Sequence, residues 1–317
     1  MNKTVLVTGG TGFLGRHLGI ALKDGHSVFL AGRNNSHNQL AKQITGCTVL
    51  PLDVTNIESV RDVFVEVKPQ IIIHAAATKY VDLSEVYPLE CIDVNVLGSQ
   101  NVARVSVEKE VPVVIGMSTD KSAPPVANTY GLTKALMERL FCAMNGKTQT
   151  QFACVRHGNL AWSTGSVLPI WKQMHDSTGV IGSTGPEMTR FFSKVDDAVD
   201  LIKTVMNNIE TLQGAVVSRA LKSARIHDIL DVWVNHKGGS WKPTEGRPGE
   251  RPHEYMIGEP ELPYTYEVYF NGTKHYVTDF KHRASQPLAA VPNSKDAERL
   301  SETEILDLIN DPPAELI

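Results

Sequence analysis

The chain is 317 residues long, 42% of them hydrophobic, and its formal net charge is -4. This length is enough to bury a full core, as one large domain or as two closely packed ones. Nucleic-acid binding requires clustered Lys and Arg on a basic domain, and this acidic chain has no long basic run, so we expect no nucleic-acid partner. No apolar run approaches the roughly 18 residues of a membrane helix, and we expect no membrane partner.

Cysteine usage and the N-terminus bear on the compartment. The N-terminus leads from Asn2 and Lys3 into an apolar strand pattern, without the hydrophobic region of a signal peptide. The cysteines form no Cys-x-x-Cys pair, and we expect buried thiols of a reducing compartment; they are Cys47, Cys91, Cys142 and Cys154. The expected location is the cytoplasm.

Alternating strand and helix patterns fill the first half of the chain. Short apolar runs predict six buried strands, at residues 3–8, 27–31, 48–52, 70–74, 111–117 and 152–156. Amphipathic spacing predicts helices at residues 16–23, 57–67, 90–108, 130–144 and 194–207. This alternation indicates an α/β fold, a Rossmann-type doubly wound parallel sheet.

The pattern loosens after residue 160. Gly, Ser, Thr and Pro crowd residues 163–186 and 237–263. We therefore assign residues 1–162 to the Rossmann-type domain and residues 163–317 mainly to a smaller C-terminal substrate-binding part. The segment 194–219 is expected to return to the first domain.

A glycine-rich turn follows the first predicted strand. Gly9, Gly10, Gly12 and Gly15 satisfy both Gly-x-x-Gly-x-x-Gly and Gly-x-Gly-x-x-Gly. Glycines let the backbone touch a pyrophosphate, and the N-terminus of the next helix faces its charge. Between a buried strand and a helix the motif indicates a dinucleotide site, and a glycine turn without a ligand is the alternative.

The end of the second strand bears on which dinucleotide binds. An acid that would hold the ribose hydroxyls of NAD is missing, and Arg33 and Asn34 stand in its place. A guanidinium fits a 2'-phosphate, which favours NADP and makes residues 1–162 an NADP-binding domain, whereas Arg33 lying over the adenine of NAD is the alternative. Further candidates for cofactor contact are Thr11, Phe13, Leu14, Asp53, Val54, Ala75 and Ala76.

The candidate catalytic residues follow the fifth strand. Thr119, Asp120 and Lys121 bring together a hydroxyl, an acid and an amine, and Tyr130 and Lys134 form a Tyr-x-x-x-Lys pair. Tyrosine has an ordinary pKa near 10, and a lysine one helical turn away favours the phenolate. The Tyr/Lys pair suits hydride transfer with a nicotinamide. The Asp-Lys pair suits removal of a proton from one carbon and expulsion of water from the next, although an Asp-Lys pair in a loop is usually solvated.

These motifs resemble those of an extended short-chain dehydrogenase/reductase. Within that superfamily the chain resembles the soluble UDP-N-acetylglucosamine 4,6-dehydratases that invert C5, which belong to polysaccharide biosynthesis. The motifs that carry the resemblance lie at residues 9–15, 74–81, 88–98, 118–121, 130–134, 155–159, 188–191 and 247–250. The resemblance implies a lyase that works as a homo-oligomer on a UDP-sugar.

The resemblance also implies roles for single residues. Tyr130 and Lys134 would oxidise C4 of the sugar, Lys121 would take the C5 proton, and Asp120 would protonate the departing C6 hydroxyl. Thr119 would hydrogen-bond the C4 oxygen. Lys79 resembles a cofactor-contacting lysine, and the residues assigned to substrate binding are Asn159, Ser166, Val167, Arg190 and Arg247. Three of these, the asparagine and the two arginines, are alternatively residues that fasten loops.

Two segments depart from the family pattern, and other functions remain open. Residues 122–129 carry one residue more than the family has, and residues 236–282 resemble nothing assignable. A UDP-hexose 4-epimerase shares the fold, the loop and the Tyr/Lys pair but needs no acid and base at C5 and C6. A non-catalytic cofactor sensor should have lost Tyr130 or Lys134. A metal site is not expected, because the pairs Met174/His175 and His253/Glu254 lack a third ligand.

Two helix patterns are more apolar than one sheet contact requires. Such helices bury a second stripe against a partner, most often a two-fold copy, so we expect at least a homodimer. The residues concerned are Val94, Leu97, Val102, Val105, Leu132, Leu136, Leu140 and Met144.

Overall fold

The computed structural model describes residues 2–246 and 249–313. Its centre is a nine-stranded sheet in the order β13-β14-β10-β6-β5-β4-β1-β2-β3. The strands are β1 (Lys3–Thr8), β2 (His26–Gly32), β3 (Thr48–Pro51), β4 (Ile71–His74), β5 (Val113–Thr119), β6 (Gln151–His157), β10 (Val216–Arg219), β13 (Thr265–Phe270) and β14 (Thr273–Thr278).

The seven strands from β3 to β10 are parallel, and β14 and β13 add an antiparallel edge. The order β3-β2-β1-β4-β5-β6 reverses direction between β1 and β4, which is where ligands bind in doubly wound sheets. The predicted α/β fold class is therefore confirmed. All six predicted strands are present within two residues of their expected bounds.

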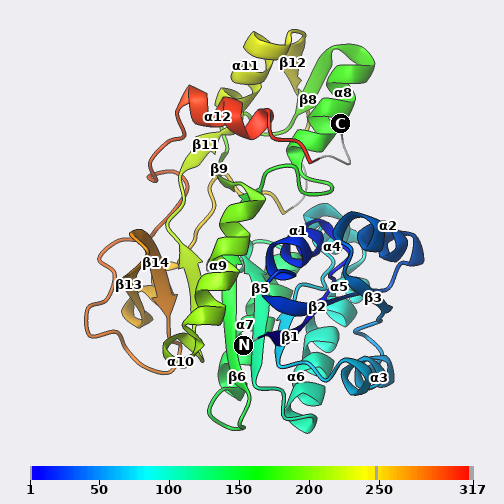
Figure 1. The fold of residues 1–317 in the computed structure, drawn as a ribbon. Helices are drawn as coiled ribbons and strands as arrows, with labels where there is room; N and C mark the ends of the chain where they lie inside the picture. Colours follow the sequence, from blue (N-terminus) through cyan, green and yellow to red (C-terminus); the bar gives the residue numbers. More distant parts are fainter. Residues whose placement is uncertain (1, 247–248, 314–317) are drawn as a thin grey trace.

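Helices cover both faces of this sheet (Figure 1). They are α1 (Phe13–Leu22), α2 (Asn35–Thr45), α3 (Ile57–Val67), α4 (Val81–Val86), α5 (Pro88–Ile92), α6 (Gly98–Glu108), α7 (Thr129–Met144), α9 (Val195–Asn207) and α10 (Ile209–Leu212). Strand residues alternate between the faces: Val5 and Val7 pack in the core with α1, α9 and α10, whereas Leu6 packs in the core with α3, α6 and α7.

A smaller layer stands over the carboxyl ends of the parallel strands (Figure 1). It consists of β7 (Asn159–Leu160), α8 (Val167–Thr178), β8 (Val180–Ser183), β9 (Thr189–Ser193), β11 (Ser223–Arg225), α11 (Ile226–Lys237), β12 (Ser240–Pro243) and α12 (Glu302–Ile309). A third core cluster, which includes Trp162, Trp171 and Trp233, holds this layer together.

Four details differ from the sequence-based expectations. The helix expected at 90–108 has a wide π turn at Asp93–Leu97 between α5 and α6. Asn95 in that turn accepts from the Thr78 amide and donates to the Thr78 carbonyl, which ties the turn to the segment after β4. Helix α2 and the β13–β14 hairpin were not predicted, and the hairpin lies in the segment left unassigned.

The fourth difference concerns the expected partner-facing stripe. Val94, Val102 and Val105 are buried in the core of the sheet domain, because they face α3 and the sheet. Leu97, Leu132 and Leu136 are exposed. The exposed apolar surface also includes Leu83, Val86, Tyr87, Leu89 and Ile92.

Candidate active site

The glycine turn lies at the point where the strand order reverses. Gly9 has φ +66°, and a Cβ placed on it would lie 2.6 Å from Cα and N of Ala76. Only glycine therefore lets the turn after β1 lie against the segment after β4. A Cβ on Gly12 would meet only the Gly9 carbonyl, at 3.3 Å, so this side of the turn is open in front of the N-terminus of α1.

Next to the turn, the side chain of Thr11 is buried against Gly32. A Cβ on Gly32 would lie only 2.2 Å from Thr11 Oγ1, so there is no room for a side chain at position 32. Phe13 is buried at the start of α1, and Leu14 packs partly buried against two core clusters. Val54 is buried after β3 and fills the space beside Gly98. The turn, the ends of β2 and β3, and the start of α6 are thus packed tightly around one another.

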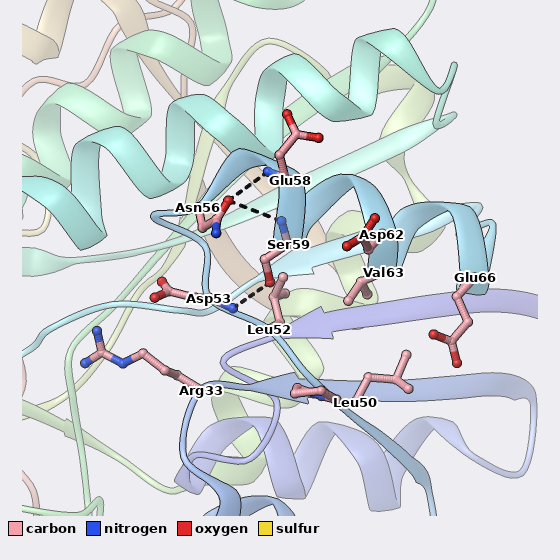
Figure 2. A pocket seen from close by; sticks show the side chains of 11 residues that line it. Arg33, Leu50, Leu52, Asp53, Asn56, Glu58, Ser59, Asp62, Val63 and Glu66 are labelled. Carbon is pink, nitrogen blue, oxygen red and sulfur yellow. Dashed lines mark hydrogen bonds between the residues drawn. The ribbon is translucent and has the colours of Figure 1, made fainter.

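A pocket of about 470 Å³ lies beyond the ends of β2 and β3 (Figure 2). Arg33 and Asp53 lie at one end of it, and the carboxylates of Glu58, Asp62 and Glu66 line its α3 side. The guanidinium of Arg33 is exposed and lies 3.5 Å from Glu90. Asn34 and Asp53 act locally: Asn34 caps α2 by accepting from the His37 amide, and Asp53 accepts from Thr55.

Thr119, Asp120 and Lys121 form the junction between β5 and a 3-10 turn, Asp120–Ser122. Lys121 Nζ lies 3.1 Å from Asp120 Oδ1, and Thr119 donates to the same oxygen at 2.9 Å. The other carboxylate oxygen, Asp120 Oδ2, is buried without a hydrogen-bond partner among the described residues. A buried carboxylate oxygen normally has a hydrogen-bond partner, so Oδ2 leaves one hydrogen bond unmade within the described residues.

Tyr130 and Lys134 lie on α7, and both side chains are buried. Burial raises the pKa of Tyr130, and the nearby carboxylate of Asp120 raises it further, whereas a hydrogen bond with Thr119 acts in the opposite direction. Burial lowers the pKa of Lys134 to about 8. Lys134 Nζ has a single hydrogen-bond contact within the described chain, the sulfur of Met137 at 3.5 Å. Because its pKa is raised, Tyr130 is a neutral phenol at pH 7.

His74 is buried at the end of β4. It hydrogen-bonds Thr8 Oγ1 at 2.7 Å and Ser99 Oγ at 3.0 Å. Burial and, to a smaller extent, the charge of the nearby Lys134 lower its pKa to about 3, so the ring is neutral.

Four of the residues assigned to substrate binding lie either near the turn at Asp120–Ser122 (Asn159 and Arg190) or at the start of α8 (Ser166 and Val167). Lys121 Nζ donates to Asn159 Oδ1 at 3.2 Å. Ser166 precedes the first residue of α8, Val167, and its Oγ is buried without a partner among the residues described. Arg190 on β9 donates to the carbonyls of Thr189 and Pro252. Arg247 lies outside the described residues.

Lys79 lies after β4, in the loop that precedes α4. Its side chain is exposed to solvent, although protein atoms lie around it. Desolvation there lowers its pKa to about 8. The next residue, Tyr80, reaches the loop before α8: a Cβ on Gly165 would lie 2.4 Å from the Tyr80 ring.

Several charged residues near the turn were not assigned a role from the sequence. Arg156 is fully buried and forms ion pairs with Glu138 and Glu261, both at 2.7 Å. Ser122 Oγ donates to Glu138 at 2.8 Å, which connects this network to the catalytic turn. Arg156 lies in one of the family motifs and Glu138 lies one helical turn beyond Lys134, and these are the signals that could have identified them. Across the described part of the chain, no group of three or more His, Cys, Asp or Glu side chains is placed to hold a metal ion.

With this geometry established, comparison with known proteins identifies the family. A model of the family described as polysaccharide biosynthesis protein matches residues 5–271. The chain belongs to this family. It is an extended short-chain dehydrogenase/reductase that resembles the UDP-N-acetylglucosamine 4,6-dehydratases, as the motifs indicated.

Relatives carry different names. An inverting UDP-N-acetylglucosamine 4,6-dehydratase of Campylobacter jejuni is 31% identical over 84% of this chain and 80% of its own length. An uncharacterized membrane protein of Methanocaldococcus jannaschii is 31% identical over 98% of this chain and 96% of its own length. A UDP-glucose 4-epimerase of Rickettsia bellii is 35% identical over 64% of this chain and 62% of its own length.

The fold is also that of a solved structure. Pen from Bacillus thuringiensis has a TM-score of 0.89 to this chain, with 23% identity over 100% of this chain and 98% of that one. In residues 2–246 and 249–313, no helix combines the length and the apolar character that crossing a membrane requires.

Proposed function

We propose that this family member is an NADP-dependent 4,6-dehydratase that acts on UDP-N-acetylglucosamine and inverts C5. The observation that carries the proposal is the buried, unpartnered Asp120 Oδ2 beside the Asp120–Lys121 ion pair. An epimerase moves a hydride to and from C4 and has no use for an acid and a base aimed at C5 and C6. The relative named as an inverting dehydratase supports the same reaction.

The cofactor site fits a dinucleotide. The open face of Gly12 and the N-terminus of α1 suit a pyrophosphate, and the buried ammonium of Lys134, in contact only with a thioether among the described residues, suits ribose hydroxyls. The nicotinamide would accept the hydride from C4 and return it to C6 of the same sugar, so the cofactor is not consumed.

The protein's residues would move protons and hold the sugar. Tyr130 takes the proton of the C4 hydroxyl, and the charges of Lys134 and an oxidised nicotinamide offset the effects that raise its pKa. The 4-keto group acidifies C5, where Lys121 takes the proton. A proton passed beforehand from the Lys121 ammonium to Asp120 leaves the neutral amine and the carboxylic acid that these steps need. Asp120 then gives this proton to the C6 hydroxyl, which leaves as water, and C5 is finally reprotonated from the opposite face. Thr119 hydrogen-bonds the C4 oxygen.

The UDP diphosphate would lie at the N-terminus of α8. Ser166 Oγ is buried there without a partner among the described residues, and the amide of Val167 belongs to the first helical turn, where anions bind. We assign Arg190 and Arg247 to the same diphosphate and Asn159 to the sugar beside Lys121. Lys79 would contact the cofactor.

We propose NADP because β2 ends in Arg33 without a carboxylate at that position. A 2'-phosphate would take the place of Glu90 as the partner of Arg33, and Asp53 and Val54 would border the adenine at the pocket of Figure 2. Calorimetry should show tighter binding of NADP than of NAD, and Arg33→Ala should remove most of that difference. Equal or tighter binding of NAD by the unaltered protein would overturn the choice.

The activity itself is tested with UDP-N-acetylglucosamine. Mass spectrometry should show loss of one water from the sugar, and NMR should show the inverted configuration at C5. Lys121→Ala should abolish dehydration, by about 10²–10⁴-fold, while reduced nicotinamide still appears transiently. Tyr130→Phe should stop both steps. Dehydration at the normal rate in Lys121→Ala would show that another group takes the C5 proton.

A UDP-hexose 4-epimerase is the second candidate, and the Rickettsia bellii relative favours it. It predicts a 4-epimer of unchanged mass and no exchange of the C5 proton with solvent deuterium. Either result, observed with UDP-N-acetylglucosamine and with UDP-glucose, would favour epimerisation over the proposed dehydration.

We further propose that the protein is a homo-oligomer of a reducing compartment, the cytoplasm. The four cysteines are free and buried. Exposed apolar side chains gather on α4, α5 and α7, which pack against one another, and a second copy would cover them. We propose the same division of the chain as before: residues 1–162 together with 194–219 form the cofactor-binding domain, and the remaining residues mainly form the substrate-binding part.

A further inference from the structure

A buried arginine from the C-terminal part holds the catalytic turn. Arg251, in the segment between β12 and the 3-10 helix η3 (Glu259–Tyr264), donates to the carbonyl oxygens of Asp120 at 3.3 Å, Ala123 at 3.3 Å and Pro125 at 2.7 Å. Gly258 lies close against Pro124, since a Cβ there would be 2.4 Å from the Pro124 carbonyl. This segment therefore supports the loop that carries one residue more than the family pattern.

The two carboxylate oxygens of Glu254 face different partners. Oε2 accepts from both Nε, at 3.0 Å, and NH2 of Arg251. Oε1 lies 3.6 Å from Lys121 Nζ and 3.7 Å from Arg190 Nε. Only 4% of the Glu254 side chain is exposed, and its backbone amide donates to Ser294. The carboxylate is thus fixed by Arg251 and faces the amine of Lys121.

We propose that Glu254 is a positioning residue that aims the Lys121 amine, with Arg251 holding both Glu254 and the catalytic turn in register. The proposal deepens the proposed function, on which it rests for the role of Lys121. A lysine has a flexible four-carbon stem, and contacts at Asp120, Asn159 and Glu254 fix its end from three separate segments.

The charges around Lys121 determine what the removal of Glu254 should do. The amine faces Asp120 from its own turn, Glu254 from the C-terminal segment and His157 from β6. Arg251 faces the other oxygen of the Glu254 carboxylate, whereas Arg190 lies at the same oxygen as Lys121. Loss of the Glu254 charge frees the Lys121 amine from one of its three fixed contacts.

The test compares Glu254→Gln with Glu259→Gln, a matched change of an exposed carboxylate five residues along the same segment. The first readout needs no substrate: limited acetylation with acetic anhydride, followed by mass spectrometry of each lysine. Because the amine loses its contact with the Glu254 carboxylate and becomes easier to reach, Lys121 should be labelled several-fold faster in Glu254→Gln, with exposed Lys242 unchanged. Glu259→Gln should match the unaltered protein.

The second readout separates the half-reactions in a single turnover. Formation of reduced nicotinamide should stay within a few-fold of normal, whereas release of the dehydrated sugar should slow by about 100-fold, since a misplacement near 1 Å costs that much. Glu254→Asp, which keeps the charge opposite Arg251, should recover part of the loss. Where Glu254→Gln does not bind the cofactor, Glu254→Asp is compared with the unaltered protein in both readouts.

Normal labelling of Lys121, or an equal loss in both half-reactions, would overturn the positioning role. If the unaltered protein forms no dehydrated sugar but Lys121 labelling still responds to Glu254→Gln, the proposed function fails and the contact stands. Normal dehydration in the unaltered protein together with normal rates in Glu254→Gln rejects the positioning role alone.

Discussion

The carboxylate of Asp120 raises the pKa of the Tyr130 phenol, although the two residues lie ten positions apart on different elements. In the proposed reaction this opposes the first step, because Tyr130 has to accept a proton from the C4 hydroxyl. The same carboxylate is required for the later loss of water. One acid thus slows one half-reaction and enables the other.

Asp120→Asn should separate these two effects. Removing the charge lowers the pKa of Tyr130, so formation of reduced nicotinamide should reach its half-maximal rate at a lower pH than in the unaltered protein. Dehydration should fall by about 10²–10⁴-fold, because the acid is gone. Stopped-flow absorbance across a pH series measures the first effect. An unmoved pH midpoint would mean that Asp120 does not act on Tyr130.

Lys134 should set an alkaline limit on C4 oxidation. Its pKa is lowered to about 8 by burial, so the stabilising positive charge is present below pH 8 and is lost as the pH rises through it. The rate of nicotinamide reduction should therefore decline above about pH 8. In Lys134→Arg the charge persists, and the decline should move to higher pH. A profile that is the same in both proteins would assign the limit to another group.

His74 should make the fold sensitive to acid. Its pKa is about 3 in the folded protein and 6.5 when unperturbed, so the unfolded chain binds the extra proton between these values. The contribution of His74 to the free energy of unfolding is therefore fully present above pH 6.5. As the pH falls from 6.5 towards 3, this contribution decreases by about 1.4 kcal/mol per pH unit.

Urea unfolding of His74→Gln should check this. The variant should be less stable at pH 7, since Thr8 and Ser99 lose their partner. Between pH 6 and 4, however, unfolding of the variant should take up one proton fewer than unfolding of the unaltered protein, so its free energy of unfolding should change less with pH. The exposed His282, replaced by Gln, serves as the control. Parallel curves for the unaltered protein and His74→Gln would contradict the prediction.

Leu132 and Leu136 test the oligomer. They lie one turn apart on α7, exposed by 58% and 53%, in a patch with Leu89 and Ile92 of α5. Light scattering of the unaltered protein should give at least twice 34.8 kDa, and the double change Leu132→Glu with Leu136→Glu should give the monomer. Val65→Glu on α3, also exposed, should leave the mass unchanged. A monomer before any substitution refutes the oligomer.

The first six strands could be predicted because each is a short apolar run, and all except β3 at the edge of the sheet are largely buried. The β13–β14 hairpin was missed although its signal is present: Asn271 and Gly272 have φ of +50° and +76°, the dipeptide typical of a tight hairpin between alternating strands. A search for that dipeptide would have placed the unassigned segment.

The site divides in a similar way. Thr119, Asp120, Lys121, Tyr130 and Lys134 are close in sequence and follow one strand, so motif spacing was enough to group them. No motif spacing connects Arg251 and Glu254 with Lys121, because more than a hundred residues separate them. Their proximity to Lys121 depends on how the C-terminal segment crosses the turn at Asp120–Ser122. The role of two nearly buried charged residues can be inferred only once their contacts in the folded protein are known.

The position of β10, β14 and β13 at one end of the sheet has a consequence for synthesis of the chain. When only the first 160 residues have emerged from the ribosome, β10 is absent and β6 is an open edge strand of the sheet. The middle of β6 is apolar and is buried in the complete protein. Such an edge recruits other strands and aggregates. The nascent chain is therefore exposed to self-association until β10 emerges to cover β6, and a fragment truncated before residue 216 should be found in inclusion bodies.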